Sequence, residues 1–142
     1  MFGAETLSAA ADAIPETLVN VTLLAGCDTL GENAFYGCPN LASITFPSTI
    51  TSIAGNALEG TAFMSNQQPG TVLYIGKILY RFFAPVDVDA NDPVYDIVVR
   101  PDTILIADDA FAGTDIRTVM MPNATVAIGA RAFANCTKLV SV

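Results

Sequence analysis

The sequence has one run of residues whose types and spacing could hold a metal ion. Asp87-Val-Asp89-Ala-Asn91 places three oxygen-bearing side chains two residues apart, and hard cations such as Ca²⁺ take closely spaced oxygen ligands. The pattern then departs from a calcium loop, because Asp92 stands in place of the turn glycine and Val98 in place of the glutamate at the twelfth position. We therefore favour a solvated loop over a calcium site.

A pair of adjacent acids, Asp108 and Asp109, is the second arrangement that could do chemistry. Paired carboxylates can act as general acid and base, but no second polar group recurs beside this pair at an inward position. We favour an interpretation in which Asp108, like Glu32, lies in the first turn of a short helix, where the helix dipole stabilises acids. The absence of histidine removes the commonest general base and most transition-metal sites. We therefore predict a protein that is not an enzyme, with no cofactor and no catalytic or metal-binding residue.

The cysteines are Cys27, Cys38 and Cys136, an odd number that leaves at least one thiol unpaired. Cys38 and Cys136 each stand four residues after an alanine, and Thr61 and Thr114 fill the same slot in related segments. The slots look like core positions, so we expect buried thiols that pack as small apolar side chains. A bridge between Cys27 and Cys38 stays open, without specific support.

The composition indicates a folded, acidic chain. Of its 142 residues 52% are hydrophobic and 14% charged, which argues against disorder. The net charge of −8 argues against nucleic acid and anionic membranes as partners, since both need basic patches. No apolar run is long enough to span a bilayer, and no signal peptide is visible. Val142 falls in the middle of an expected strand, so we expect an excerpt from a longer array.

The elements that position these residues are repeats, because one short phrase occurs four times. The copies are Leu30-Gly-Glu-Asn-Ala34-Phe35-Tyr-Gly-Cys38, Ile53-Ala-Gly-Asn-Ala57-Leu58-Glu-Gly-Thr61, Ile106-Ala-Asp-Asp-Ala110-Phe111-Ala-Gly-Thr114 and Ile128-Gly-Ala-Arg-Ala132-Phe133-Ala-Asn-Cys136. Ala34 and Ala57 are 23 residues apart, and Ala110 and Ala132 are 22 apart. Such a period is typical of a solenoid, in which each unit buries its apolar face against its neighbours.

Each repeat also contains apolar residues spaced three and then two apart. The instances are Leu18-Val21-Leu23, Leu41-Ile44-Phe46, Ile116-Val119-Met121 and Leu139-Val142. This spacing predicts a turn that enters a short strand with alternate residues inward. We expect parallel strands near residues 19–23, 43–46, 118–121 and 140–142, in one right-handed α/β solenoid. The Ala-Phe segments are expected to form short helical turns on the convex side.

The expected strands point a second set of side chains away from the core, on the face that solenoids commonly use for partners. These side chains are small and mostly uncharged. The candidate partner-binding residues are Asn20, Thr22, Ser43, Thr45, Thr118, Met120 and Ser141. Serine and threonine also tile parallel sheets without any binding role, so both interpretations stay open.

An insertion of about 30 residues separates the second and third Ala-Phe phrases. Within it, Val72–Ile75 and Ile78–Phe82 flank Gly76-Lys77, which predicts a β-hairpin. The hairpin is rich in aromatic residues, and Tyr74 and Tyr80 are candidate aromatic anchors for a partner. The alternative is that these rings pack the hairpin onto the solenoid.

With these residues in view, the chain resembles the BspA-like leucine-rich repeat family. The Ile-Gly-x-x-Ala-Phe-x-x-Cys-x-x-Leu-x-x-Ile-x-Ile-Pro signature is most complete at Leu30–Pro47 and Ile128–Val142. Leu58 in place of Phe, and Thr61 and Thr114 in place of Cys, are conservative departures. The resemblance implies a long surface or secreted array of host-associated bacteria or protozoa, in a family without a catalytic motif and with some adhesins.

We therefore expect one solenoid domain over residues 1–142. Its repeats are expected at about 14–36, 37–63, 94–114 and 115–136, with a partial repeat at 137–142 and an insertion at about 64–93. The leading hypothesis is a non-enzymatic interaction module, extracellular or at the cell surface, that binds a host or matrix protein or another cell-surface protein. Self-association through the C-terminal edge is a further expectation. The alternatives are a structural spacer and an accessory, carbohydrate-binding domain of a larger secreted protein.

Overall fold

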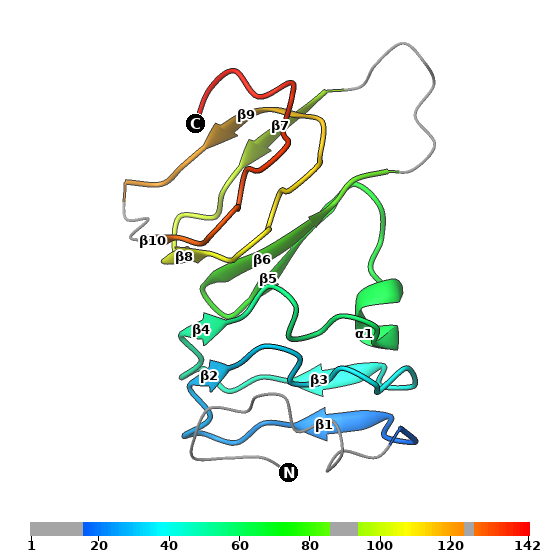
Figure 1. Cartoon of the computed structure of the whole chain (residues 1–142). Coiled ribbons are helices and arrows are strands. Elements are labelled where there is room, and N and C mark those ends of the chain that lie inside the picture. Colours follow the sequence, from blue (N-terminus) through cyan, green and yellow to red (C-terminus); the bar gives the residue numbers. More distant parts are fainter. Residues whose placement is uncertain (1–15, 86–93, 124–126) are drawn as a thin grey trace. The chain divides into compact units, whose positions relative to one another are not determined.

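The computed structural model describes residues 16–85, 94–123 and 127–142. The chain divides into two compact units, Met1–Gln67 (unit 1) and Gln68–Val142 (unit 2), whose elements are labelled in Figure 1. The Asp87-Asp89-Asn91 loop lies outside the described residues. The expectation of a single domain therefore stays a prediction, and each unit is described by itself.

In unit 1, every repeat contributes two short strands to two separate parallel sheets. The strands are β1 (Asn20–Thr22), β2 (Thr29–Leu30), β3 (Ser43–Thr45) and β4 (Ser52–Ile53). β1 pairs with β3, and β2 pairs with β4, both in parallel. Val21 and Ile44, which are opposite each other in the first sheet, are buried between exposed neighbours. The spacing of three and then two residues therefore predicted β1 and β3, and their inward residues Val21 and Ile44, correctly.

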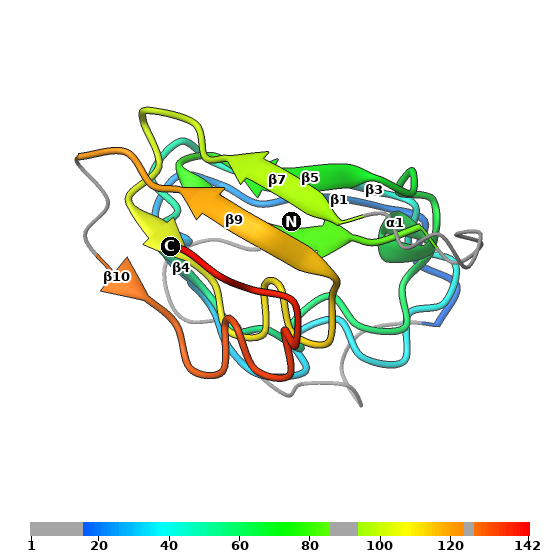
Figure 2. The same cartoon turned by 90° about the horizontal axis from the view of Figure 1, so that it is seen from above.

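Unit 2 also contains two sheets, and its hairpin belongs to one of them. The strands are β5 (Thr71–Ile75), β6 (Ile78–Phe83), β7 (Tyr95–Val98), β8 (Leu105–Ile106), β9 (Ile116–Met120) and β10 (Ala127–Ile128). β7 pairs in parallel with β9, as the view from above in Figure 2 shows, and Thr118 of β9 forms a bridge with Ser141. The other sheet has the order β10-β8-β6-β5.

The β5–β6 hairpin takes the place of a repeat strand. β5 and β6 are antiparallel and are joined by Gly76 and Lys77, with Gly76 at φ 58°, as a tight hairpin turn requires. β6 also pairs in parallel with β8. Two expectations need correction. β1–β3 and β7–β9 are separate sheets, so the predicted strands do not form one continuous ladder, and residues 140–142 form no strand but only the bridge from Ser141 to Thr118.

The Ala-Phe segments are hydrogen-bonded turns and not the short helices that we expected. The residue before the alanine is left-handed in three copies, at Asn33, Asp109 and Arg131. The residue three after the alanine is left-handed in all four copies, at Gly37, Gly60, Gly113 and Asn135. Left-handed residues cannot continue a right-handed helix, so each segment bends back after a single turn. The one helix among the described residues is α1 (Ala62–Ser65), with Thr61 as its N-cap.

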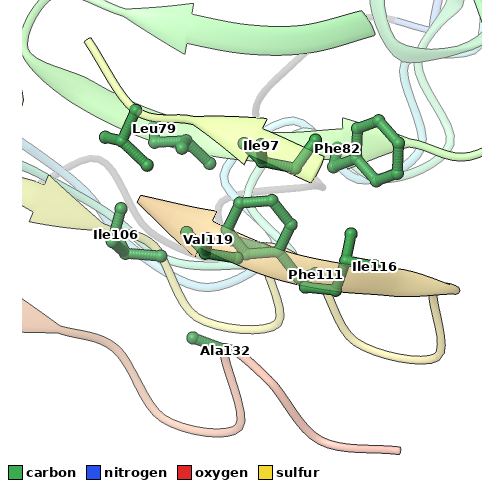
Figure 3. Close-up of a cluster of buried hydrophobic side chains, with 10 residues drawn as sticks. Leu79, Phe82, Ile97, Ile106, Phe111, Ile116, Val119 and Ala132 are labelled. Carbon is green, nitrogen blue, oxygen red and sulfur yellow. The ribbon is translucent and has the colours of Figure 1, made fainter. Parts of the chain in front are cut away.

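The apolar side chains of each repeat pack against the next repeat. In unit 1, Leu30, Phe35, Leu41 and Leu58 are all fully buried. Figure 3 shows the cluster of unit 2, where side chains from the hairpin, β7, β9 and the turns meet. Within it, Phe111 stacks on Phe133 of the next repeat with ring centroids 5.3 Å apart and planes 7° apart. The inward placement of these rings was predicted correctly.

The side chain four residues after the repeat alanine donates a hydrogen bond to a backbone carbonyl of the Ala-Phe turn. The hydroxyls of Thr61 and Thr114 donate to the carbonyls of Leu58 and Phe111 at 2.7 and 2.6 Å. The Cys136 thiol also donates to the Phe111 carbonyl, at 3.0 Å.

The cysteines Cys27, Cys38 and Cys136 are all free, so the open Cys27–Cys38 bridge is not formed. Cys27 and Cys38 are buried, and burial raises the pKa of both thiols. Cys136 is only partly buried, against our expectation of three core cysteines.

Candidate interaction surface

The outward face of unit 1 is a neutral polar surface on β1 and β3. Asn20 lies opposite Ser43, and Thr22 lies opposite Thr45. All four are exposed, because the residues between them point into the core. The structure thus brings together the four candidate residues of unit 1 as two adjacent rows.

The corresponding face of unit 2 has a different chemistry. The first row contains Asp96, Thr118 and Ser141, and the second contains Val98 and Met120. Val98 and Met120 are directly opposite each other and are 71% and 64% exposed. Asp96 and Val98 were not among the residues predicted from the sequence, although Ile97 stands 22 residues before Val119 and that period could have revealed the strand.

A network of polar contacts fixes the first row of unit 2. The Arg117 guanidinium donates to both carboxylate oxygens of Asp96, through Nε at 3.0 Å to Oδ1 and through a second nitrogen to Oδ2. The Thr118 hydroxyl donates to Asp96 Oδ1 at 2.6 Å. The hydrogen bonds from Arg117, and next those from Thr118, lower the pKa of Asp96. The carboxylate is therefore charged at neutral pH, and its charge is matched by Arg117.

The two proposed aromatic anchors turn out differently. Tyr80 is fully buried and cannot contact a partner. The prediction that Tyr80 is an aromatic anchor was therefore wrong. Its neighbours Ile78 and Leu79 are buried as well, and this strand therefore lacks the exposed face that alternation predicts. Tyr74 is half-buried and packs within its own unit.

Tyr74 contacts the segment that follows β7. The Arg100 guanidinium lies 4.5 Å from the centre of the Tyr74 ring, and the Arg100 backbone N–H donates to the phenol oxygen at 3.1 Å. Arg100 also donates to the Gly76 carbonyl at 3.2 Å and to Asp102 at 2.8 Å. These contacts hold the hairpin within unit 2, and one ring face of Tyr74 is already occupied.

Polar side chains also connect successive turns. In unit 1 the Asn56 amide donates to the side-chain oxygen of Asn33 at 3.3 Å. In unit 2 the equivalent pair is Asp109 and Arg131, with contacts of 3.0 and 2.8 Å. Asp108 accepts the backbone N–H of Ala130 at 2.7 Å. The two acids therefore lie in a turn and not in the expected helical turn, and both also bind the following repeat.

Within residues 16–85, 94–123 and 127–142, no group of three or more His, Cys, Asp or Glu side chains could hold a metal ion. None of the helices formed by these residues is long and apolar enough to cross a membrane.

A comparison with protein families gives one match that extends over most of the chain. The model described as "BspA type Leucine rich repeat region" matches residues 15–140 in six copies. No curated protein sequence matches the chain significantly.

Two solved structures are similar at low sequence identity. The pneumococcal vaccine antigen PcpA is 17% identical over 96% of this chain and 42% of its own, with a TM-score of 0.43. A leucine-rich cell surface protein from Faecalibacterium prausnitzii A2-165 is 24% identical over 87% of this chain and 41% of its own, with a TM-score of 0.40. The chain thus spans less than half the length of either structure.

Proposed function

Because the chain belongs to the BspA-type leucine-rich repeat family, we propose that it is a non-enzymatic protein-interaction module of a cell-surface or secreted protein. Its partner is a host or matrix protein, or another cell-surface protein. The observation that carries the proposal is the exposed outward face, where side chains of neighbouring repeats form adjacent rows. Repeat proteins of this kind use such rows as extended binding surfaces.

The chemistry of the face supports protein recognition over the alternatives. Asn20, Thr22, Ser43 and Thr45 offer uncharged donors and acceptors, while Val98 and Met120 offer apolar area beside the matched charges of Asp96 and Arg117. Within unit 2, this apolar area beside matched charges resembles the apolar centre and polar rim of protein interfaces. A pure spacer has no need for exposed apolar side chains in register on one face.

The binding test uses the purified chain on immobilised fibronectin and laminin. The double variant Thr22→Lys, Thr45→Lys changes the face of unit 1, and Val98→Ser, Met120→Ser changes that of unit 2. The matched control is Ser48→Lys, Thr49→Lys, since both residues are exposed but outside the strands.

We expect binding by the unaltered chain and the control, and at least a tenfold loss in one face variant. Lost binding in the control as well would indicate a nonspecific charge effect. Binding retained by both face variants but lost in Tyr74→Ala would move the contact to the hairpin.

Self-association through the C-terminal edge is part of the proposal, because Val140 and Val142 are 75% and 57% exposed. Sedimentation velocity on the same samples measures it. A monomer at all concentrations would remove this part while leaving the binding proposal intact. A right-handed path within each unit, expected for parallel β connections, is likewise inferred.

A further inference from the structure

All of the basic side chains of this protein lie in one of the two units. Unit 1 contains six acids and no Lys, Arg or His, whereas unit 2 contains eight acids and all six basic residues. Side-chain ion pairs therefore cannot form within unit 1. In unit 2 they form at regular places, as the contacts between its repeats show.

Among the described residues of unit 2, three ion pairs join consecutive repeats. Asp96 binds Arg117 between β7 and β9. Asp109 binds Arg131 at 2.8 Å between two Ala-Phe turns. Asp115 binds Lys138 at 3.2 Å just before the two following strand segments.

Unit 1 uses neutral amides at two of the equivalent positions. Asn33 and Asn56 stand where Asp109 and Arg131 stand, directly before the repeat alanine, and they hydrogen-bond to each other. Asn40 stands directly before Leu41, as Asp115 stands before Ile116, and its amide donates to the Glu16 carbonyl at 3.2 Å. The two units thus connect their repeats at the same points with groups that respond differently to protons, because an amide does not titrate and a carboxylate does.

We propose that unit 2 is an acid-sensitive segment, whose repeats loosen at low pH while those of unit 1 stay in place. The inference is independent of the proposed binding function, since it concerns only the contacts between repeats.

The sign of the effect is set by Asp96, one of three carboxylates that each face a basic side chain. Asp96 faces Arg117 and the Thr118 hydroxyl, Asp109 faces Arg131 with Asp108 beside it, and Asp115 faces Lys138. The pKa of Asp96 is lowered in the folded state, chiefly by Arg117. A lowered folded-state pKa stabilises the fold above the unfolded value of about 4, and this stabilisation disappears as the pH falls through the folded value.

Acid has no side-chain ion pair to break within unit 1. Glu16, Asp28 and Glu32 are exposed acids in a unit without basic side chains, so the contacts between the repeats of unit 1 are expected to be unchanged at low pH. Each exposed pair of unit 2 contributes little alone, and Asp96 is the carboxylate whose lowered pKa sets the sign of the effect.

Amide hydrogen exchange on the whole chain tests the proposal at pH 7 and pH 3, with protection expressed relative to the intrinsic rate at each pH. Informative amides are those bonded across repeats. In unit 2 these are Phe111 to Ala132 and Val119 to Ser141, and in unit 1 Leu23 to Thr45 and Phe35 to Ala57. We expect protection in unit 2 to fall about threefold or more at pH 3, with no fall in unit 1. An equal fall in both units would overturn the proposal.

Three variants keep the test specific. Asp96→Asn, Asp109→Asn, Asp115→Asn should reproduce the low protection of unit 2 at pH 7 and remove its pH dependence, whereas Asp28→Asn, Glu32→Gln should leave unit 1 protected. The exchanged pair Asp109→Arg, Arg131→Asp keeps the charges together and should retain both protection and acid sensitivity. Full pH dependence in the triple variant would rule out the ion pairs as its cause.

Discussion

Two successive repeats of unit 2 follow the same sequence pattern but bury their side chains to different degrees. Ile106 is fully buried and Ile128 is 53% exposed, although both stand four residues before the repeat alanine. Val119 is buried and the equivalent Val142 is 57% exposed. Because the sequence pattern is similar, the difference in burial comes from the following repeat, which covers Ile106 and Val119. In a repeat fold, the local sequence directs a side chain inward, and packing against the following repeat buries it.

The largest expected effect tests this difference through the stacked rings. Phe111→Ala removes a fully buried ring and should cost about 3–5 kcal/mol, whereas Phe133→Ala removes a half-buried ring and should cost about 1–3 kcal/mol. Urea unfolding with unchanged m-values measures both changes. Equal losses of unfolding free energy in the two variants would mean that each repeat buries its own ring. That result would contradict the role of the following repeat.

A smaller effect is expected where the two repeats approach most closely. A Cβ at Gly129 would stand 2.3 Å from Asp108 Oδ1 and 2.5 Å from the Asp108 backbone nitrogen. Gly129→Ala should therefore cost about 1–3 kcal/mol through overpacking. At the equivalent position of unit 1, Ala54 already carries the methyl group.

The control for this variant is Gly113→Ala, where a Cβ would meet nothing within 4 Å but the φ of 71° disfavours a side chain. It should cost about 1 kcal/mol from backbone strain alone. If thermal unfolding shows Gly129→Ala to be neutral, the Asp108 contact is not a tight repeat boundary.

The hydrogen bond within the turn is expected to have a still smaller effect. Thr114→Val keeps the shape of the side chain and removes the 2.6 Å hydrogen bond to the Phe111 carbonyl, which should cost about 1 kcal/mol. The Cys136 thiol bonds the same carbonyl and limits the loss. Thermal unfolding of this variant, beside Thr137→Val at an exposed position, isolates the contribution. If the unfolding midpoints of Thr114→Val and Thr137→Val are indistinguishable, the side chain at position 114 contributes through its volume and not through its hydrogen bond.

The smallest effect is expected on the outward face. Ser43→Ala and Thr45→Ala alter exposed side chains and should change stability by less than about 0.5 kcal/mol. The same variants measured for partner binding separate the two roles of the strand, since its alternate residues serve the core and the surface. A destabilisation as large as that of Phe133→Ala would mean that the two faces are assigned wrongly.

The sequence predicted what repeats locally. The repeated pattern identified β1, β3 and β9 and the inward rings, because alternation within one strand decides which side chains face the core. The β-hairpin was predictable for the same reason, since Gly76-Lys77 between apolar runs is a local signal.

Features that depend on a neighbouring repeat were missed. Asp108 and Asp109 looked like the start of a helix, yet their partners Ala130 and Arg131 stand 22 residues later. Asn33 and Gly37 do signal left-handed turns, and weighing them would have corrected the helix prediction. Tyr80 was a candidate anchor because the hairpin is rich in aromatic residues, but β6 is buried at three consecutive residues, and only the surrounding elements determine that.

The two-residue connection between β5 and β6 also has a consequence for how the chain folds. Closing a short loop costs less conformational entropy than closing a long one, and isolated hairpins form in about 1–10 μs. Every parallel pairing in unit 2 must instead bring together segments from different repeats. The hairpin is therefore expected to form first and to offer the edge of β6 to β8, after which β8 receives β10. In pulse-labelled exchange, amides of β6 should gain protection before Val119 and Val140.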